Sequence, residues 1–300
     1  MKVFIDGESG TVGLQIYERL ENRSDIELLK IAPELSENAD ERKKFLNAAD
    51  FVFLCLPDEA AKQSVSLINE TGNTKTRIID ASTAHRTHPD WTYGFPELSK
   101  EREEEIRISK RVATPGCYAS GFVALVYPLV KAGIIKPDFP VYSYGISGYS
   151  GAGKAFIEEY KKADERIPAK LYALDQNHKH LPEMEMHGGL TLTPMFNPVI
   201  DNFYSGMVVN VPLQTCGKFG IEEVSDVYKK HYIGGRVKFK GINANDAPLF
   251  AVNELSGSDD MEIYVFGSDE RILLTARFDN LGKGASGAAV QCFDIMKGKE

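Results

Sequence analysis

The chain has 300 residues, more than one hydrophobic core usually supports, so we expect two domains. Its 43% hydrophobic and 26% charged residues are typical of a globular protein, and its net charge of -8 disfavours nucleic acid and anionic membranes as partners. No stretch approaches the ~20 apolar residues of a membrane-spanning helix, and the apolar run at 2–5 is too short for a signal peptide. The cysteines lack metal-ligand spacing, which predicts no metal and reduced thiols in the cytoplasm; they are Cys55, Cys117, Cys216 and Cys292.

The N-terminal region has the pattern of a dinucleotide-binding turn. A β-rich run at 2–6 leads into glycines at 7, 10 and 13, and apolar positions at 14, 16, 17 and 20 then predict a helix. In this context backbone N–H groups at a helix N-terminus hold a pyrophosphate. The spacing is G-x-x-G-x-x-G and not the commoner G-x-G-x-x-G, so a purely structural tight turn is the alternative.

Further strands are predicted at 26–31, 51–56, 77–80 and 111–114, with helices at 40–49 and 57–72. The run at 51–56 is continuously apolar, as in a parallel strand buried on both faces. The ribose site beyond the second strand offers one nearby acid, Glu34, and three basic residues at 42–44, so local chemistry leaves NAD and NADP both open. The polar loop at 81–86 ends in Arg86, which is either a carboxylate or phosphate clamp or an ordinary surface arginine.

Cys117 stands directly after a Pro-Gly turn and before the apolar run at 122–130. A thiol at a helix N-terminus lies near unpaired N–H groups and the positive end of the helix dipole, which lowers its pKa and favours the thiolate. We therefore interpret Cys117 as a nucleophile on a buried helix at 119–132. The alternative is an inert cysteine in a core.

Beyond this helix, the pattern changes to that of an α+β domain with a mostly antiparallel sheet. Partial alternation and turn residues predict strands, and the chain ends in a small-residue helix that we expect to pack back on the first domain. The predicted strands are 141–146, 190–194, 203–211, 262–266 and 271–277, the predicted helices 155–162, 221–231 and 284–297. The sequence thus predicts an α/β protein with a Rossmann-type domain at 1–116, joined by 284–297, and a catalytic and oligomerisation domain at 117–283.

Two polar segments of the second domain are candidates for substrate chemistry. The segment 147–154 has glycines, hydroxyls and Lys154 ahead of a helix, which suits an anion cradle. In the segment 178–183, an extended backbone would place His178 and His180 on one face, with Glu183 able to orient one of them as an acid/base. A zinc site would need further ligands, and His187 is the only nearby candidate.

Six blocks together resemble N-acetyl-gamma-glutamyl-phosphate reductases of the shorter type, which are related to aspartate-semialdehyde dehydrogenase. They are Gly7-x-x-Gly10-x-x-Gly13, Asp80-Ala-Ser-Thr-Ala-His-Arg86, Pro115-Gly-Cys-Tyr118, Ser147-Gly-Tyr-Ser-Gly-Ala-Gly153, His178-Lys-His-Leu-Pro-Glu183 and Asn280-Leu-Gly-Lys-Gly284. The resemblance implies an NADPH-dependent reduction of an acyl phosphate in arginine biosynthesis, with Cys117 as nucleophile and a histidine as acid/base. We assign the latter role to His180, with His178 as the alternative.

The resemblance also implies the binding residues. We expect cofactor contacts from Gly7, Ser9, Gly10, Thr11, Val12, Gly13, Ser82, Lys283 and Gly284. We expect substrate contacts from Arg86, Ser147, Tyr149, Ser150, Gly151 and Lys154. The expected assembly is a cytoplasmic homo-oligomer, a dimer or tetramer. Two alternatives remain: a reductase for another acyl phosphate, such as aspartyl phosphate, and a nucleotide-binding sensor without catalysis.

Overall fold

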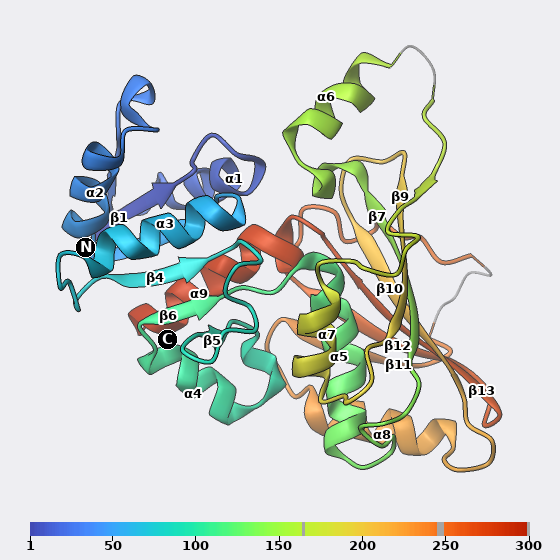
Figure 1. The fold of residues 1–300 in the computed structure, drawn as a ribbon. Coiled ribbons are helices and arrows are strands. Elements are labelled where there is room, and N and C mark those ends of the chain that lie inside the picture. Colours follow the sequence, from blue (N-terminus) through green and yellow to red (C-terminus); the bar gives the residue numbers. More distant parts are fainter. Residues whose placement is uncertain (164–165, 245–248, 299–300) are drawn as a thin grey trace. The chain divides into compact units, whose positions relative to one another are not determined.

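The computed structural model describes residues 1–163, 166–244 and 249–298. The chain forms two compact units (Figure 1). Unit 1 comprises Met1–Pro96, Glu101–Pro115 and Ala285–Glu300, and unit 2 comprises Glu97–Lys100 and Gly116–Gly284. Among the described residues, no helix is long and apolar enough to cross a membrane.

Unit 1 is built on a six-stranded sheet of order β2-β1-β3-β4-β6-β5, in which every neighbouring pair is parallel. Its strands are β1 (Lys2–Asp6), β2 (Glu27–Leu29), β3 (Phe51–Leu54), β4 (Arg77–Asp80), β5 (Thr92–Tyr93) and β6 (Arg111–Ala113). Its helices are α1 (Thr11–Leu20), α2 (Ala39–Ala48), α3 (Asp58–Asn69), α4 (Lys100–Ile108) and α9 (Gly287–Lys297). The predicted Rossmann-type parallel sheet is confirmed.

The side-chain alternation of the strands divides the core of unit 1 into two layers. Val3 and Ile5 of β1 point to the layer that contains residues of α1 and α9, and Phe4 points to the layer with residues of α2 and α3. Because both faces are covered, β3 is apolar at every position and wholly buried. The C-terminal helix α9 contributes Phe293, which packs edge-on against Phe51 with ring centroids 5.0 Å apart. The last helix therefore completes the core that the first strands begin.

Unit 2 contains a seven-stranded sheet of order β11-β12-β13-β10-β7-β9-β8. The pairs β11·β12 and β7·β9 are parallel and the other four are antiparallel, so the predicted mostly antiparallel sheet is confirmed. The strands are β7 (Tyr142–Gly148), β8 (Lys170–Leu171), β9 (Met195–Asp201), β10 (Met207–Gln214), β11 (Val237–Ile242), β12 (Met261–Gly267) and β13 (Arg271–Phe278). The helices are α5 (Cys117–Lys131), α6 (Lys154–Lys162), α7 (Leu181–Gly188) and α8 (Ile221–His231).

The prediction of a strand at 190–194 is wrong, because no strand forms there. Helix α7 closes at Gly189, which has the left-handed φ of 75° typical of a helix end, and the N–H of Leu190 still bonds to Glu185 of that helix. The strand begins only at Met195, directly after Pro194.

Helix α5 is the buried centre of unit 2, and its packing explains two unusual residues. Gly121 lets the helix approach the sheet, since a Cβ there would lie 2.7 Å from Val209 of β10 and 2.8 Å from Phe278 of β13. Pro128 cannot donate the helical hydrogen bond to the carbonyl of Ala124, and that carbonyl instead accepts the hydroxyl of Tyr232 at 2.7 Å. The proline is therefore tolerated without leaving a buried carbonyl unsatisfied.

Candidate active site

Cys117 is the first residue of α5, two residues earlier than the predicted helix start. Gly116 is the N-cap, with extended backbone angles of φ −72° and ψ 148°, and its carbonyl accepts the first helical hydrogen bond from Ser120 at 2.8 Å. The Cys117 side chain is half-buried. The thiol therefore lies at the end of the helix where first-turn N–H groups have no helical acceptor and the dipole favours negative charge.

A buried carboxylate holds the turn that precedes the thiol. Glu183 of α7 accepts a hydrogen bond from the backbone N–H of Gly116 at 3.2 Å. This contact joins the segment 178–183 to the Pro-Gly turn at 115–116, directly before Cys117. The sequence predicted that Glu183 orients a histidine. It did not predict that Glu183 also fixes the backbone before Cys117.

The expectation of an extended segment at 178–183 is wrong. Residues 178–181 form a turn in which Leu181 N–H bonds to the carbonyl of His178 at 2.9 Å, and His180 has helical backbone angles as the N-cap of α7. Proline is favoured at the start of a helix as well as in extended chain, so Pro182 did not distinguish the two. The N–H of His180 donates to Nδ1 of His178 at 3.1 Å, which makes the two histidines distinct in environment.

Both histidine rings pack against the ring of Tyr118. Its buried ring lies 5.9 Å from the ring of His178 and 6.2 Å from that of His180, measured between centroids, and its hydroxyl donates to the carbonyl of Val199 at 3.0 Å. Gly145 makes room for this ring, because a Cβ there would lie 2.6 Å from it. Since Tyr118 follows Cys117 directly, the packing places the two histidines beside the start of α5.

Two tyrosines stay protonated at this site. Burial, with a further contribution from Tyr172 and a Cys117 thiolate, raises the pKa of Tyr118 well above its usual range. Burial, together with the charge of Cys117, also raises the pKa of Tyr172. Both hydroxyls are therefore neutral hydrogen-bonding groups near the thiol, and sequence reasoning missed Tyr172 because nothing in its local pattern marks it.

The segment at 282–286 is a π-helical turn whose glycine touches the nucleophile. A Cβ on Gly284 would lie 3.0 Å from Cβ of Cys117, and the N–H of Gly284 bonds to the carbonyl of Asp279 at 2.9 Å. The preceding Lys283 directs its ammonium to Glu97.

The predicted anion cradle at 147–154 is a strand end, a short 3-10 turn (Tyr149–Ala152) and the start of α6. Ser147 and Ser150 are buried, and Ser150 accepts a hydrogen bond from the amide of Asn280 at 2.9 Å. A Cβ on Gly151 would lie 3.2 Å from the same amide. Tyr149 stacks on Tyr160 with centroids 4.5 Å apart, and Lys154 is an exposed first residue of α6. The loop is therefore tied to the 280–284 segment through Asn280, while its lysine faces solvent.

The glycine turn of unit 1 is too compact for side chains at two of its positions. Gly7 has a φ of 92°, and a Cβ there would overlap the carbonyl oxygen of Cys55. A Cβ on Gly13 would overlap the carbonyl of Gly7, so helix α1 can begin this close to the turn only with glycine. The segment 9–13 contains Ser9, the N-cap Gly10 and the first helical residues Thr11 and Val12, whose N–H groups have no acceptor in a helix. These residues fit a pyrophosphate.

The three basic residues at 42–44, which follow the second strand, all have acidic partners. Arg42 is buried, with Nη2 at 2.9 Å from Asp6 and 2.6 Å from Ser64. Lys43 pairs with Glu70 and Lys44 with Glu41 at the surface. Arg42 therefore fixes the end of β1 just before the glycine turn.

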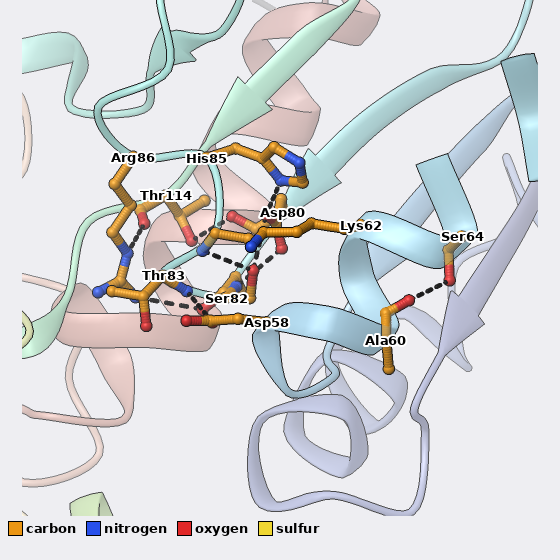
Figure 2. A network of polar contacts seen from close by, with 12 residues as sticks. Asp58, Ala60, Lys62, Ser64, Asp80, Ser82, Thr83, His85, Arg86 and Thr114 are labelled. Atoms are coloured by element: carbon orange, nitrogen blue, oxygen red, sulfur yellow. Dashed lines mark hydrogen bonds and ion pairs between the residues drawn. The ribbon is translucent and has the colours of Figure 1, made fainter. Parts of the chain in front are cut away.

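The loop after β4 is organised by the buried carboxylate of Asp80 (Figure 2). Asp80 accepts hydrogen bonds from the N–H and hydroxyl of Ser82, both at 2.8 Å, and lies 2.6 Å from Nδ1 of His85. Arg86 donates to the carbonyls of Thr114 at 3.0 Å and Ala81 at 3.2 Å. The arginine therefore bridges the loop to the strand end that leads towards the Cys117 turn, and its role as a substrate clamp stays a prediction.

Each unit thus brings together part of the predicted site. In unit 2, the thiol, both histidines, the carboxylate and the glycine at 284 are linked by the contacts above. In unit 1, the glycine turn and the Ser82 loop follow β1 and β4, whose carboxyl ends lie at one edge of the parallel sheet, where open α/β sheets bind ligands.

Comparisons with known proteins show the family. Residues 2–106 match the family described as semialdehyde dehydrogenase, NAD binding domain, and residues 117–280 match semialdehyde dehydrogenase, dimerisation domain. The fold and the site thus define the class, the semialdehyde dehydrogenase type of oxidoreductase.

The N-acetyl-gamma-glutamyl-phosphate reductases of Brucella anthropi and Brucella ovis are 47% and 45% identical to this chain over 309 residues, covering 99% of it and 99% of each relative. The chain therefore belongs to the N-acetyl-gamma-glutamyl-phosphate reductase family.

Solved structures show the same fold at low identity. Aspartate semialdehyde dehydrogenase from Francisella tularensis has a TM-score of 0.76 at 17% identity, covering 99% of this chain and 100% of that one. The enzyme from Candida albicans, solved with NADP, has a TM-score of 0.67 at 16% identity, covering 99% and 98%.

Proposed function

We propose that the protein catalyses the NADPH-dependent reductive dephosphorylation of N-acetyl-L-glutamyl 5-phosphate to N-acetyl-L-glutamate 5-semialdehyde, a step of arginine biosynthesis. The observation that carries the proposal is the surroundings of the thiol at the first residue of α5. Two histidines lie against the adjoining Tyr118, and the buried Glu183 accepts a hydrogen bond from the backbone of Gly116. Membership of the reductase family supports the same substrate.

The chemistry begins at the thiol of Cys117. The thiolate attacks the acyl carbon, phosphate leaves, and a thioester forms on the sulfur, which divides one difficult step into two easier ones. The first-turn N–H groups of α5 are donors for the negative oxygen of the tetrahedral intermediate. When bound, the reduced dinucleotide supplies the hydride. His180 is the proposed acid/base that protonates the hemithioacetal oxygen and then removes that proton as the aldehyde forms and the thiolate leaves, with His178 as the alternative.

Binding is divided between the two parts of the chain. We assign the dinucleotide to the domain at 1–116 with 284–297, through the glycine turn and Ser82, and the substrate and subunit contacts to the domain at 117–283. Arg86 and the 147–154 loop are the proposed holders of the substrate's anionic groups. NADP over NAD is supported by the relative solved with NADP. A homo-oligomer, either a dimer or a tetramer, is supported by the dimerisation domain matched at 117–280. We place the enzyme in the cytoplasm because its cysteine spacing suits reduced thiols.

The test is phosphate- or arsenate-dependent reduction of NADP⁺ with N-acetylglutamate semialdehyde, run beside aspartate semialdehyde and beside NAD⁺. We expect kcat/KM to be at least tenfold higher with NADP⁺, since tenfold is about 1.4 kcal/mol and one phosphate contact suffices. Faster turnover of aspartate semialdehyde would favour the other acyl-phosphate reductase. Binding of the dinucleotide with no turnover of either aldehyde would favour the non-catalytic sensor.

A further inference from the structure

Lys283 is a deeply buried lysine whose ammonium pairs with the carboxylate of Glu97. Its side chain is 1% exposed and that of Glu97 10% exposed, and Nζ lies 2.8 Å and 2.7 Å from the two carboxylate oxygens of Glu97. A charge of this burial is retained only with a close partner, because the cost of removing it from water is otherwise uncompensated.

Glu97 is itself anchored within unit 2 through its backbone. Its carbonyl accepts a hydrogen bond from Nε2 of His231, at the end of α8, at 3.1 Å. The segment Glu97–Lys100 belongs to unit 2, although residues 101–115 between it and the rest of that unit belong to unit 1. Lys283 is therefore held by a residue that is fixed at both its main chain and its side chain.

The residue after Lys283 is the one that touches the nucleophile. The backbone of Gly284 lies so close to Cys117 that a Cβ would come within 3.0 Å of Cβ and 3.4 Å of Cα of that cysteine. The N–H of Gly284 is bonded to the carbonyl of Asp279 at 2.9 Å. The π-helical turn beside the thiol is thus held by two contacts, the backbone bond to Asp279 and the ion pair of Lys283 with Glu97.

We propose that the Glu97–Lys283 ion pair positions Cys117 by pressing the Gly284 backbone against it, and that neither side chain contacts substrate or cofactor. The inference rests on the proposed function in that Cys117 is the nucleophile. Both residues are positioning residues, and their loss changes the reactivity of the thiol and the turnover number and leaves cofactor affinity unchanged.

The test compares Glu97→Gln and Lys283→Met, each of which removes one charge at nearly constant shape, with Lys229→Met as control. Lys229 is an exposed lysine of α8, paired with Asp226 at 3.1 Å. We measure kcat, the Kd of NADPH by fluorescence, and the rate of Cys117 alkylation by iodoacetamide.

We expect both variants to lose about tenfold or more in kcat, since a 1 Å misplacement costs up to ~10² in rate. The alkylation rate should change at least about threefold, and the Kd of NADPH should stay within about twofold. The double variant should lose no more than the worse single variant, because both act through one contact. Lys229→Met should match the wild type in all three measurements.

Two results would overturn the inference. The first is a lower melting temperature while kcat and the alkylation rate, each per folded molecule, stay within twofold of the wild type. The ion pair would then stabilise the fold without positioning Cys117. The other is weaker NADPH binding in Lys283→Met but not in Glu97→Gln, which means a cofactor contact. If the neutral variants do not fold, Glu97→Asp keeps the charge pair one methylene shorter, and it must show the same change in alkylation rate for the inference to stand. Alkylation needs no substrate, so this arm is independent of the proposed function.

Discussion

Replacing Gly284 with alanine tests how closely the 282–286 turn must approach the nucleophile. The added Cβ would lie 3.0 Å from Cβ of Cys117 and 3.1 Å from the carbonyl oxygen of Asp279. Both contacts are tighter than carbon atoms normally make, so the turn or Cys117 must move by a few tenths of an ångström.

The size of the effect follows from that displacement. Overpacking of this kind costs about 1–3 kcal/mol, which lowers the melting temperature by roughly 2–10 °C in a protein of this size. Since a misplacement of 1 Å costs up to ~10² in rate, a shift of a few tenths of an ångström at Cys117 predicts a fall in kcat of about 3- to 10-fold. The assay is phosphate-dependent NADP⁺ reduction with saturating substrates, together with thermal unfolding.

Gly188→Ala is the matched control. It adds a Cβ against α5, the helix that begins with Cys117, but at residues further along the helix than the thiol. Its Cβ would lie 3.3 Å from the ring of Phe122 and 3.7 Å from Val126. We expect a comparable loss of melting temperature with kcat unchanged. Equal kcat for the two variants would refute the reasoning, and so would a Gly284→Ala defect that disappears at saturating NADP⁺, since the glycine would then act on cofactor binding alone.

Three further predictions concern single side chains. Cys117→Ala should abolish turnover while NADPH still binds, and an acyl adduct trapped on another cysteine would contradict its role. His180→Asn should lose ~10²–10⁴ in kcat with little change in NADPH affinity, and His178→Asn should lose less; the reverse order transfers the acid/base role to His178. Burial lowers the pKa of His231 in the folded protein below the ordinary value of 6.5. As the pH falls, this histidine therefore takes up a proton in the unfolded chain before it does so in the folded protein, and stability is lost as the pH falls through 6.5. His231→Gln should therefore flatten the fall in melting temperature from about pH 7.5 to about pH 5.5, and parallel curves for the two proteins would exclude this histidine as a cause.

Much of the fold was determined by local sequence patterns. The glycine spacing at 7, 10 and 13 and the apolar run at 51–56 predicted the parallel sheet, because each pattern reports the burial of its own element. The Pro-Gly-Cys order placed the thiol at a helix start for the same reason: the turn and the apolar run that follows it are adjacent in the chain. The motif blocks predicted the family because their joint presence is far more specific than any one of them.

Tertiary structure decided which polar groups meet. Arg42 reaches Asp6 across 36 residues and Lys283 reaches Glu97 across 186, and no periodicity connects such partners. The segment at 178–183 was predicted as extended, although it is a turn and a helix start, since proline suits both and only packing against Tyr118 and the Gly116 turn selects one. A sequence reports the environment of each element, whereas the partner of a buried charge is fixed only when distant elements pack together.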